Sequence, residues 1–152
     1  MISNDPEATG WLADAEVVTD VLEGRASLIG IHAALVMARG SVIVVAWDMP
    51  FVPSTLIAEM HRRLRGETTA VVPIGPSGPE GACAAYAPSA LPHVERAVAR
   101  GLLKVSDLIA TLPNVDLISP ADVARFGDPD EMFFNVNHPG DVRRAEAIAS
   151  AL

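Results

Sequence analysis

The sequence predicts a three-layer α/β/α fold built on a mostly parallel β-sheet. Segments rich in β-branched residues alternate with segments whose apolar residues recur at helical spacing. This alternation is typical of α/β domains, in which helices connect the strands of one sheet. The chain has 152 residues, half of them hydrophobic, which is enough for one domain with a substantial core.

Residues 42–47 carry the clearest strand signal. The run Val-Ile-Val-Val-Ala-Trp is too short for a helix and rich in β-branched side chains, so it predicts an interior strand of a parallel sheet. Asp48 ends the run, and Pro50 and Pro53 then force a turn. Open α/β sheets bind their ligands at the carboxyl ends of the strands. We therefore expect Asp48 to lie at the ligand-binding edge of the sheet.

Four other short runs carry the strand signal, which is an apolar or β-branched stretch bounded by turn-forming residues. In chain order these are residues 16–19, 68–74, 82–86 and 115–118. The glycine- and proline-rich segment 75–81 is expected to be a loop, and residues 132–136 are expected to be extended. No repeat or low-complexity segment interrupts the series, so a single domain over residues 1–152 is expected.

Helices are expected where apolar residues recur every three or four positions. In chain order these are residues 27–39, 54–66, 92–101, 104–112 and a last helix that opens at Pro139. Ser27 and Ser54 are the expected N-caps of the first two helices. Ser119-Pro-Ala-Asp122 resembles a further helix start. The apolar residues of the last helix, Val142 among them, are expected to face inward.

The composition excludes several classes of partner. The net charge is −8, with 11 basic and 19 acidic residues, which argues against binding to nucleic acid or to an anionic membrane. The single cysteine, Cys83, allows no internal disulfide and fits a reducing cytoplasm. No apolar run approaches the length of a membrane span, and the polar start is unlike a signal peptide. We therefore expect a cytoplasmic domain.

Asp48 is the leading candidate for chemistry. One carboxylate held at a rigid strand end suits a hard cation such as Mg²⁺ and the phosphates that accompany it. The alternative is that Asp48 only caps the turn into the next helix. Asp20 could likewise only cap the turn that follows it. Asn135 and Asn137 could likewise hydrogen-bond only to the local backbone. A phospho-acceptor role for Asp48 is less favoured, because the partner acids and the downstream lysine of such sites are missing.

Three segments stand out together: Val18-Thr-Asp20, Asp48-Met-Pro-Phe51 and Phe133-Phe-Asn-Val-Asn-His-Pro-Gly-Asp141. In order and character they resemble the "V-x-D", "D-M-P-F" and "F-x-N-V-N-T-P-E-D" elements of the MobA-like nucleotidyltransferases. Ala26-Ser-Leu-Ile-Gly30 takes the place of that family's "G-P-L-A-G" helix start. The resemblance spans nearly the whole chain and is strongest to the molybdenum cofactor guanylyltransferases. It implies a Rossmann-like, GT-A-like nucleotidyltransferase fold.

The resemblance also implies a reaction, a metal and a set of site residues. The reaction is transfer of GMP from GTP to a molybdopterin-type molybdenum cofactor, with Mg²⁺ as the metal. The implied residues are Asp48 as the catalytic and metal-binding acid, Asn4, Asp20 and Gly30 on the nucleotide side, and Asn135 and Asn137 on the side of the acceptor substrate.

The chain departs from the family most clearly in lacking the opening "L-A-G-G-x-S-x-R-M-G-x-x-K". That segment holds the triphosphate with backbone amides, an arginine and a lysine. We therefore expect a domain without its first strand, loop and helix, through a start-site truncation or a true loss, and little or no transferase activity from this chain alone. An exposed sheet edge and self-association are also expected. Two alternatives are a non-catalytic remnant that binds the cofactor or a partner, and a cytidylyltransferase of the same fold.

Overall fold

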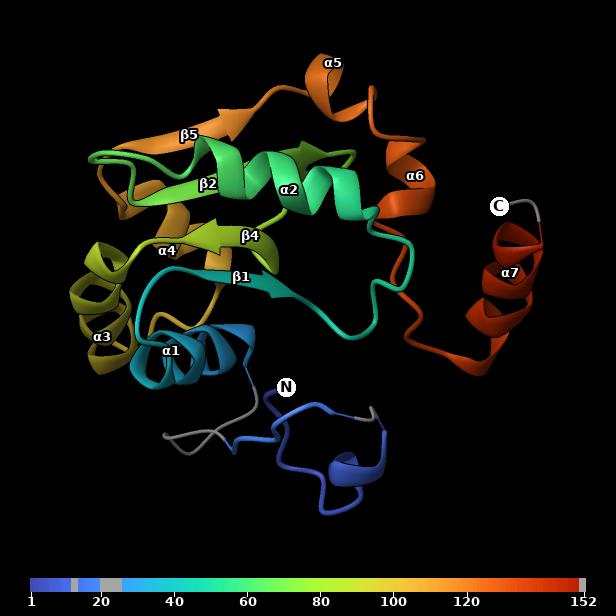
Figure 1. The fold of residues 1–152 in the computed structure, drawn as a ribbon, viewed down its shortest axis with the longest axis horizontal. Coiled ribbons are helices and arrows are strands. Elements are labelled where there is room, and N and C mark those ends of the chain that lie inside the picture. Colours follow the sequence, from blue (N-terminus) through green and yellow to red (C-terminus); the bar gives the residue numbers. More distant parts are fainter. Residues whose placement is uncertain (12–13, 20–25, 151–152) are drawn as a thin grey trace.

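The computed structural model describes residues 1–11, 14–19 and 26–150. In chain order the elements are η1 (Ala8–Gly10), α1 (Ser27–Met37), β1 (Val42–Val45), α2 (Ser54–Arg63), β2 (Ala70–Gly75), β3 (Gly78–Pro79), β4 (Cys83–Tyr86), η2 (Pro88–Ala90), α3 (Leu91–Ala99), α4 (Val105–Thr111), β5 (Val115–Ile118), α5 (Pro120–Val123), α6 (Pro129–Met132) and α7 (Pro139–Ala149). Figure 1 shows a central sheet with helices on both faces, which confirms the predicted three-layer architecture. Within the described part of the chain, no helix is long and apolar enough to cross a membrane.

The sheet has the strand order β1-β4-β2-β3, and β5 pairs with β2. β2 and β5 are parallel, whereas β4 pairs antiparallel with both β1 and β2. β1, β2 and β5 therefore run in one direction, as the sequence predicts, and β4 is inserted between two of them in the opposite direction. Part of the segment expected to be a loop is instead a hairpin, because Gly75 pairs with Gly78 and Ile74 with Pro79.

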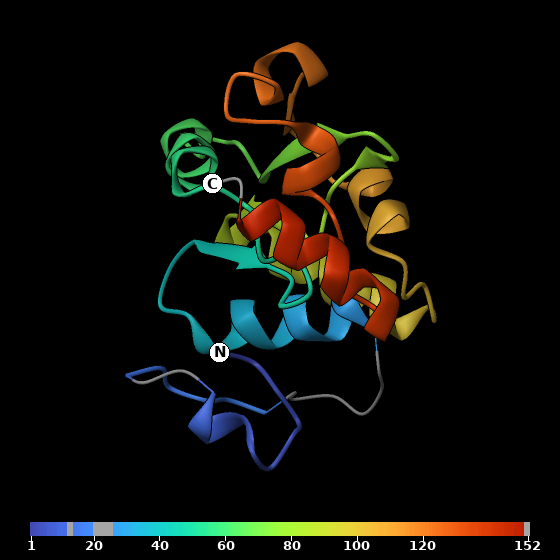
Figure 2. The ribbon, with the colours of Figure 1, turned by 90° about the vertical axis from the view of Figure 1, so that its right-hand side faces the viewer.

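The N-terminal segment contributes a single bridge rather than the strand predicted for residues 16–19. Ile2 pairs in parallel with Val18, and the Ser3 N–H donates to the Val18 carbonyl at 3.0 Å. Figures 1 and 2 both place this segment beside α1, at the end of the molecule away from β5. β1 is the last strand in the sheet order, and its Val45 side chain is 37% exposed. Among the described residues, no strand pairs with the outer edge of β1, in agreement with the expected exposed edge, while self-association stays a prediction.

Each face of the sheet is covered by its own hydrophobic core. α1, α3 and α4 cover one face, and α2, α5 and the residues around Met132 cover the other. Strand alternation divides the side chains between them: in β4, Ala84 and Tyr86 point into the first core, and Cys83 and Ala85 into the second. All four are fully buried, so β4 is the central strand that joins the two layers.

Several local predictions differ from the structure at element ends. The N-cap positions of α1 and α2 are Ala26 and Pro53, with no side-chain cap, so Ser27 and Ser54 begin their helices instead of capping them. Ser119 does cap α5, since its hydroxyl accepts the Asp122 N–H at 3.2 Å. The wrong predictions share a cause: a serine before an apolar run signals a helix start without fixing which residue is the cap.

The C-terminal region corrects two further predictions. Met132 ends α6 and Phe133 forms a turn, so the predicted extended run 132–136 is wrong at its start. In α7, Ile148 is buried as expected, but Val142 is 45% exposed. Figure 1 shows why, because α7 lies at the edge of the molecule and only one side of it can face the rest of the chain.

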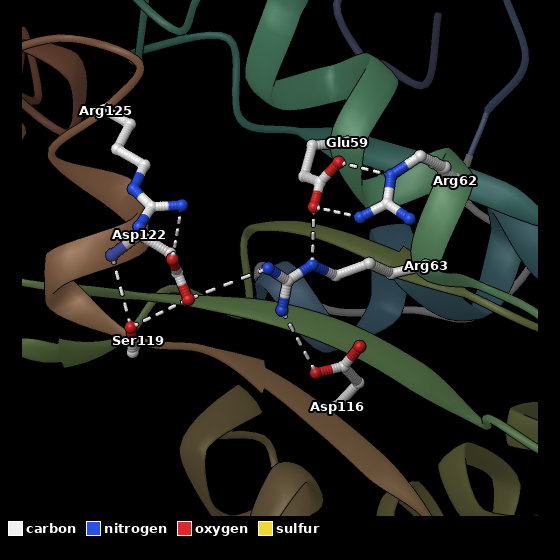
Figure 3. A network of polar contacts seen from close by, with 7 residues as sticks. All are labelled: Glu59, Arg62, Arg63, Asp116, Ser119, Asp122 and Arg125. Atoms are coloured by element: carbon white, nitrogen blue, oxygen red, sulfur yellow. Dashed lines mark hydrogen bonds and ion pairs between the residues drawn. The ribbon is translucent and has the colours of Figure 1, made fainter.

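A network of charged side chains links α2 to β5 and α5, and Figure 3 shows it from close by. Arg62 donates two hydrogen bonds to the Glu59 carboxylate at 2.6 and 2.7 Å, and Arg63 donates one at 2.7 Å. Arg63 also lies 3.5 Å from Asp116 and 3.8 Å from Asp122. These two arginines are therefore held by acids of the fold itself.

This network makes stability depend on pH in the acid range. The hydrogen bonds from Arg62 and Arg63 lower the pKa of Glu59 from its ordinary value of 4.5 to about 2. Because the folded-state pKa is the lower one, the stabilisation is present above about pH 4.5 and is lost as the pH falls towards 2. Glu59→Gln should therefore lower the free energy of unfolding by about 1 kcal/mol at pH 7, with the difference vanishing near pH 2.

Urea denaturation of both proteins between pH 2 and pH 7 measures this difference. Glu146→Gln on the exposed side of α7 is the matched control, and it should leave the curve unchanged. A constant offset between Glu59→Gln and the parent protein over the whole pH range would contradict the assignment.

Candidate active site

Asp48 lies where β1 ends, at the carboxyl-terminal end of the parallel strands, as the sequence predicts. The strand pairing extends one residue beyond β1, because the Ala46 N–H donates to the Ala82 carbonyl at 2.8 Å. A turn follows, in which the Met49 N–H donates back to the Ala46 carbonyl at 3.0 Å and the Met49 side chain is buried. Asp48 itself is half-buried. Its backbone is therefore fixed on both sides by sheet and turn hydrogen bonds.

The structure brings the segment 135–137 directly to Asp48. The Val136 N–H donates to the backbone carbonyl of Asp48 at 2.9 Å, across 88 positions of the sequence. Asn135 is half-buried and donates its side-chain N–H to the Phe133 carbonyl at 3.3 Å, so the local hydrogen bond considered for it is present. Asn137 is exposed. Figure 1 shows this segment and α7 on the same side of the sheet as the turn after β1.

The loop that carries Asn135 and Asn137 is held in shape from the start of α7. The Asp141 carboxylate accepts the backbone N–H groups of Asn137 at 3.0 Å and His138 at 2.9 Å. Arg144, one turn further along α7, lies over the Phe134 ring at 4.3 Å from the ring centre. These contacts anchor both ends of the loop, so Asn135 and Asn137 are presented by a fixed backbone.

A cleft of about 630 Å³ lies between the N-terminal segment, α1 and the free edge of β1. Gly30 lines it from α1, and a Cβ atom at that position would meet no atom within 4 Å, so the helix surface is open there. Trp47 lines the cleft from the end of β1, and Ile2 from the N-terminal segment. Asp48 is not among its lining residues, so the acid lies beside this cleft rather than inside it.

The other two residues predicted for the nucleotide side, Asn4 and Asp20, are not placed at the cleft by the structure. Asn4 is exposed, two positions after the cleft-lining Ile2. Asp20 lies outside the described residues. The structure therefore joins Asp48 to the Asn135–Asn137 loop and places Gly30 on the neighbouring cleft.

Two features of this region were missed by sequence reasoning. Glu80 comes from a segment expected to be an exposed loop, yet it is half-buried beside Gly75 and Phe133, and this burial raises the pKa of its carboxyl group. Trp47 reads as the last apolar residue of a buried strand, yet it is 84% exposed. The signal for Trp47 was its position, since it directly precedes Asp48 at the end of the strand.

The single cysteine, Cys83, is a buried thiol. It is fully buried on β4, and burial, with the charge of Glu80 nearby, raises the pKa of its thiol to about 12. The thiol therefore stays protonated at neutral pH and is a poor nucleophile.

Asp48 is the side chain of this site best suited to hold a metal ion. Mg²⁺ is commonly bound by one or two carboxylates together with substrate phosphates, rather than by a complete protein cage. A single half-buried carboxylate on a rigid strand end, directly after the cleft-lining Trp47, has the donor chemistry that such a shared site needs.

Comparison with known proteins identifies the family. A model of the MobA-like NTP transferase domain matches residues 1–115. The molybdenum cofactor guanylyltransferase of Desulfosudis oleivorans is 31% identical, over 99% of this chain and 74% of that protein. A probable molybdenum cofactor guanylyltransferase of Pelotomaculum thermopropionicum is 32% identical, over 98% of this chain and 72% of that protein.

A solved structure agrees with these relatives. The crystal structure of molybdopterin-guanine dinucleotide biosynthesis protein A from Archaeoglobus fulgidus is 33% identical and matches with a TM-score of 0.83, covering 99% of this chain and 78% of that one. Sequence and fold thus point to the same group of proteins. The chain belongs to the MobA-like NTP transferase family of nucleotidyltransferases.

Proposed function

We propose that this domain transfers GMP from GTP to a molybdopterin-type molybdenum cofactor, with Mg²⁺ held at Asp48. The observation that supports this most directly is the hydrogen bond from the Val136 N–H to the Asp48 carbonyl, which joins the acidic strand end to the Asn135–Asn137 loop. The names of the relatives from Desulfosudis oleivorans and Archaeoglobus fulgidus support the guanine nucleotide and the molybdopterin acceptor.

In this reaction the terminal phosphate of the acceptor attacks the α-phosphorus of GTP. A P–O bond forms to the acceptor oxygen, the bond to the β-phosphate breaks, and pyrophosphate leaves. When bound, Mg²⁺ neutralises charge on the phosphates and aligns them. Such a transfer depends on alignment and charge stabilisation more than on a covalent protein partner.

The residues of the chain divide the task of alignment. Asp48, on a backbone fixed by hydrogen bonds, would hold the Mg²⁺ that neutralises the phosphates. Gly30 leaves the α1 surface open, so that the nucleotide can lie against the helix. Asn135 and Asn137 bind the acceptor from a loop that Asp141 holds in place. Because the Val136–Asp48 hydrogen bond sets the distance between the two sides, acceptor and nucleotide meet at the end of β1.

The test is to incubate the chain with Mg²⁺, molybdenum cofactor and either GTP or CTP, and to measure the dinucleotide product and pyrophosphate. We expect the guanine dinucleotide and none of the cytosine product. The rate should be low, because residues 1–152 contain no glycine-rich segment with an arginine and a lysine to hold the triphosphate.

Other outcomes distinguish the alternatives. Product from CTP but not from GTP would overturn the guanine assignment in favour of cytidylyl transfer. Tight binding of the cofactor without product from either nucleotide, at any Mg²⁺ concentration, would instead support a non-catalytic binding module.

A further inference from the structure

Trp47 lines the cleft beside Asp48, and its ring lies next to that of a second exposed tryptophan, Trp11. Trp47 is 84% exposed and Trp11 is 48% exposed. Their ring centres lie 6.4 Å apart with the planes tilted by 36°. A tryptophan side chain has roughly 150–250 Å² of surface to bury, and Trp47 leaves most of its surface in water. Folding therefore gains little from Trp47, which makes a role in binding the better explanation for a ring at this position.

The position of Trp47 defines what it can contact. It lines the 630 Å³ cleft together with Gly30 and Ile2, and it is the residue directly before Asp48. Trp11 follows η1 in the N-terminal segment, which Figures 1 and 2 place beside α1. At the end of β1, the aromatic pair therefore lies on the side of the cleft. The Asn135–Asn137 loop contacts the same strand end through the backbone of Asp48.

We propose that Trp47, supported by Trp11, is the stacking surface for the base of the nucleotide in this cleft. The inference rests on the proposed function, since it assumes that a nucleotide binds with its phosphates at Asp48. An indole face attracts planar heteroaromatic rings, and base–aromatic stacking tolerates any base. Trp47 therefore contributes affinity and orientation, while the choice of guanine has to come from other groups. The surface is assigned to the base rather than to the ring of the acceptor, because residues 135–137 do not line the cleft.

The test separates the base from the phosphates by using three probes: GTP with Mg²⁺, guanosine, and inorganic tripolyphosphate with Mg²⁺. Binding is measured by calorimetry, which does not depend on tryptophan fluorescence. Trp47→Ala should weaken GTP and guanosine binding by the same factor, roughly ten- to a hundredfold. Tripolyphosphate binding should be unchanged. Trp47→Phe, which keeps an aromatic face, should recover most of the loss.

Asp48→Asn provides the complementary measurement. It should weaken binding of Mg²⁺-tripolyphosphate and leave guanosine binding unchanged, so failure of the stacking role and failure of the phosphate site are distinguishable. Leu103→Ala is the matched control for loss of an exposed apolar side chain, since Leu103 is 42% exposed and lies outside the cleft. Circular dichroism of each variant verifies the fold.

Two results would overturn the inference. One is guanosine binding to Trp47→Ala as tight as to the parent protein. The other is a loss of tripolyphosphate binding in Trp47→Ala equal to the loss of GTP binding, because a stacking residue has no effect on a ligand without a ring.

Discussion

Asp48→Asn is expected to reduce guanylyl transfer by roughly a hundredfold or more, the scale on which single groups that stabilise transition-state charge contribute. Asparagine keeps the size of the side chain and a carbonyl oxygen, but it removes the negative charge that binds Mg²⁺. In the part of the chain that the structure describes, no group of three or more histidine, cysteine or acidic side chains is placed to hold a metal ion in its stead. The substitution should also abolish the dependence of GTP binding on Mg²⁺.

The measurement is the rate of product and pyrophosphate formation over a series of Mg²⁺ concentrations, with calorimetric titration of GTP in the presence and absence of Mg²⁺. Glu95→Gln is the matched control, because it removes the same charge from an exposed position on α3. If Asp48→Asn retained the Mg²⁺ dependence of the parent protein, the metal would be held elsewhere and the proposed site would be wrong. An equal loss in Glu95→Gln would indicate an effect of net charge alone.

Tyr86→Ala should destabilise the fold by about 3–5 kcal/mol, the usual cost of removing a large aromatic side chain from a core. Tyr86 is fully buried on β4, the strand that joins β1 to β2, and it belongs to the core under α1, α3 and α4. Its hydroxyl donates to the Gly81 carbonyl at 2.7 Å. Burial raises the pKa of this hydroxyl above its usual value, so it remains a donor throughout the neutral range.

Tyr86→Phe separates packing from hydrogen bonding. It keeps the ring and leaves only the Gly81 carbonyl without its donor, which should cost about 1–3 kcal/mol. Urea denaturation measures both variants, and a shift of the midpoint with an unchanged slope identifies a change in stability. Equal losses in the two variants would mean that the hydrogen bond, and not the ring, accounts for the effect. A loss below 1 kcal/mol in Tyr86→Ala would contradict the central role of β4.

The sequence by itself determined the architecture and the position of the acid. Period and composition were sufficient to locate β1, β2, β4, β5 and the helices from α1 to α4, because a buried strand and an amphipathic helix each leave a local pattern. Asp48 at the end of β1 followed from the abrupt end of one such pattern. The resemblance of three separate segments to the MobA-like family added the reaction class, which local physics could not supply.

Local pattern failed where the outcome depended on distant neighbours. β4 reads as a short apolar strand whichever way it runs, and only its pairing with both β1 and β2 makes it antiparallel. Val142 has helical spacing, but its exposure depends on how α7 lies at the edge of the molecule (Figure 1). Glu80 occurs in a loop-like sequence, but the hairpin places its side chain against Gly75.

The candidate site also combines features that the sequence predicts with features that only the tertiary structure decides. The sequence named Asp48, Asn135 and Asn137 separately, and each also had an ordinary structural explanation. Only the folded chain joins Asp48 to the asparagine loop through one hydrogen bond across 88 positions, and only it leaves Trp47 exposed at the cleft. The physical reason is that residue type and spacing determine the local conformation of a segment and its preference for burial. Which distant segment it contacts is decided only by the tertiary structure.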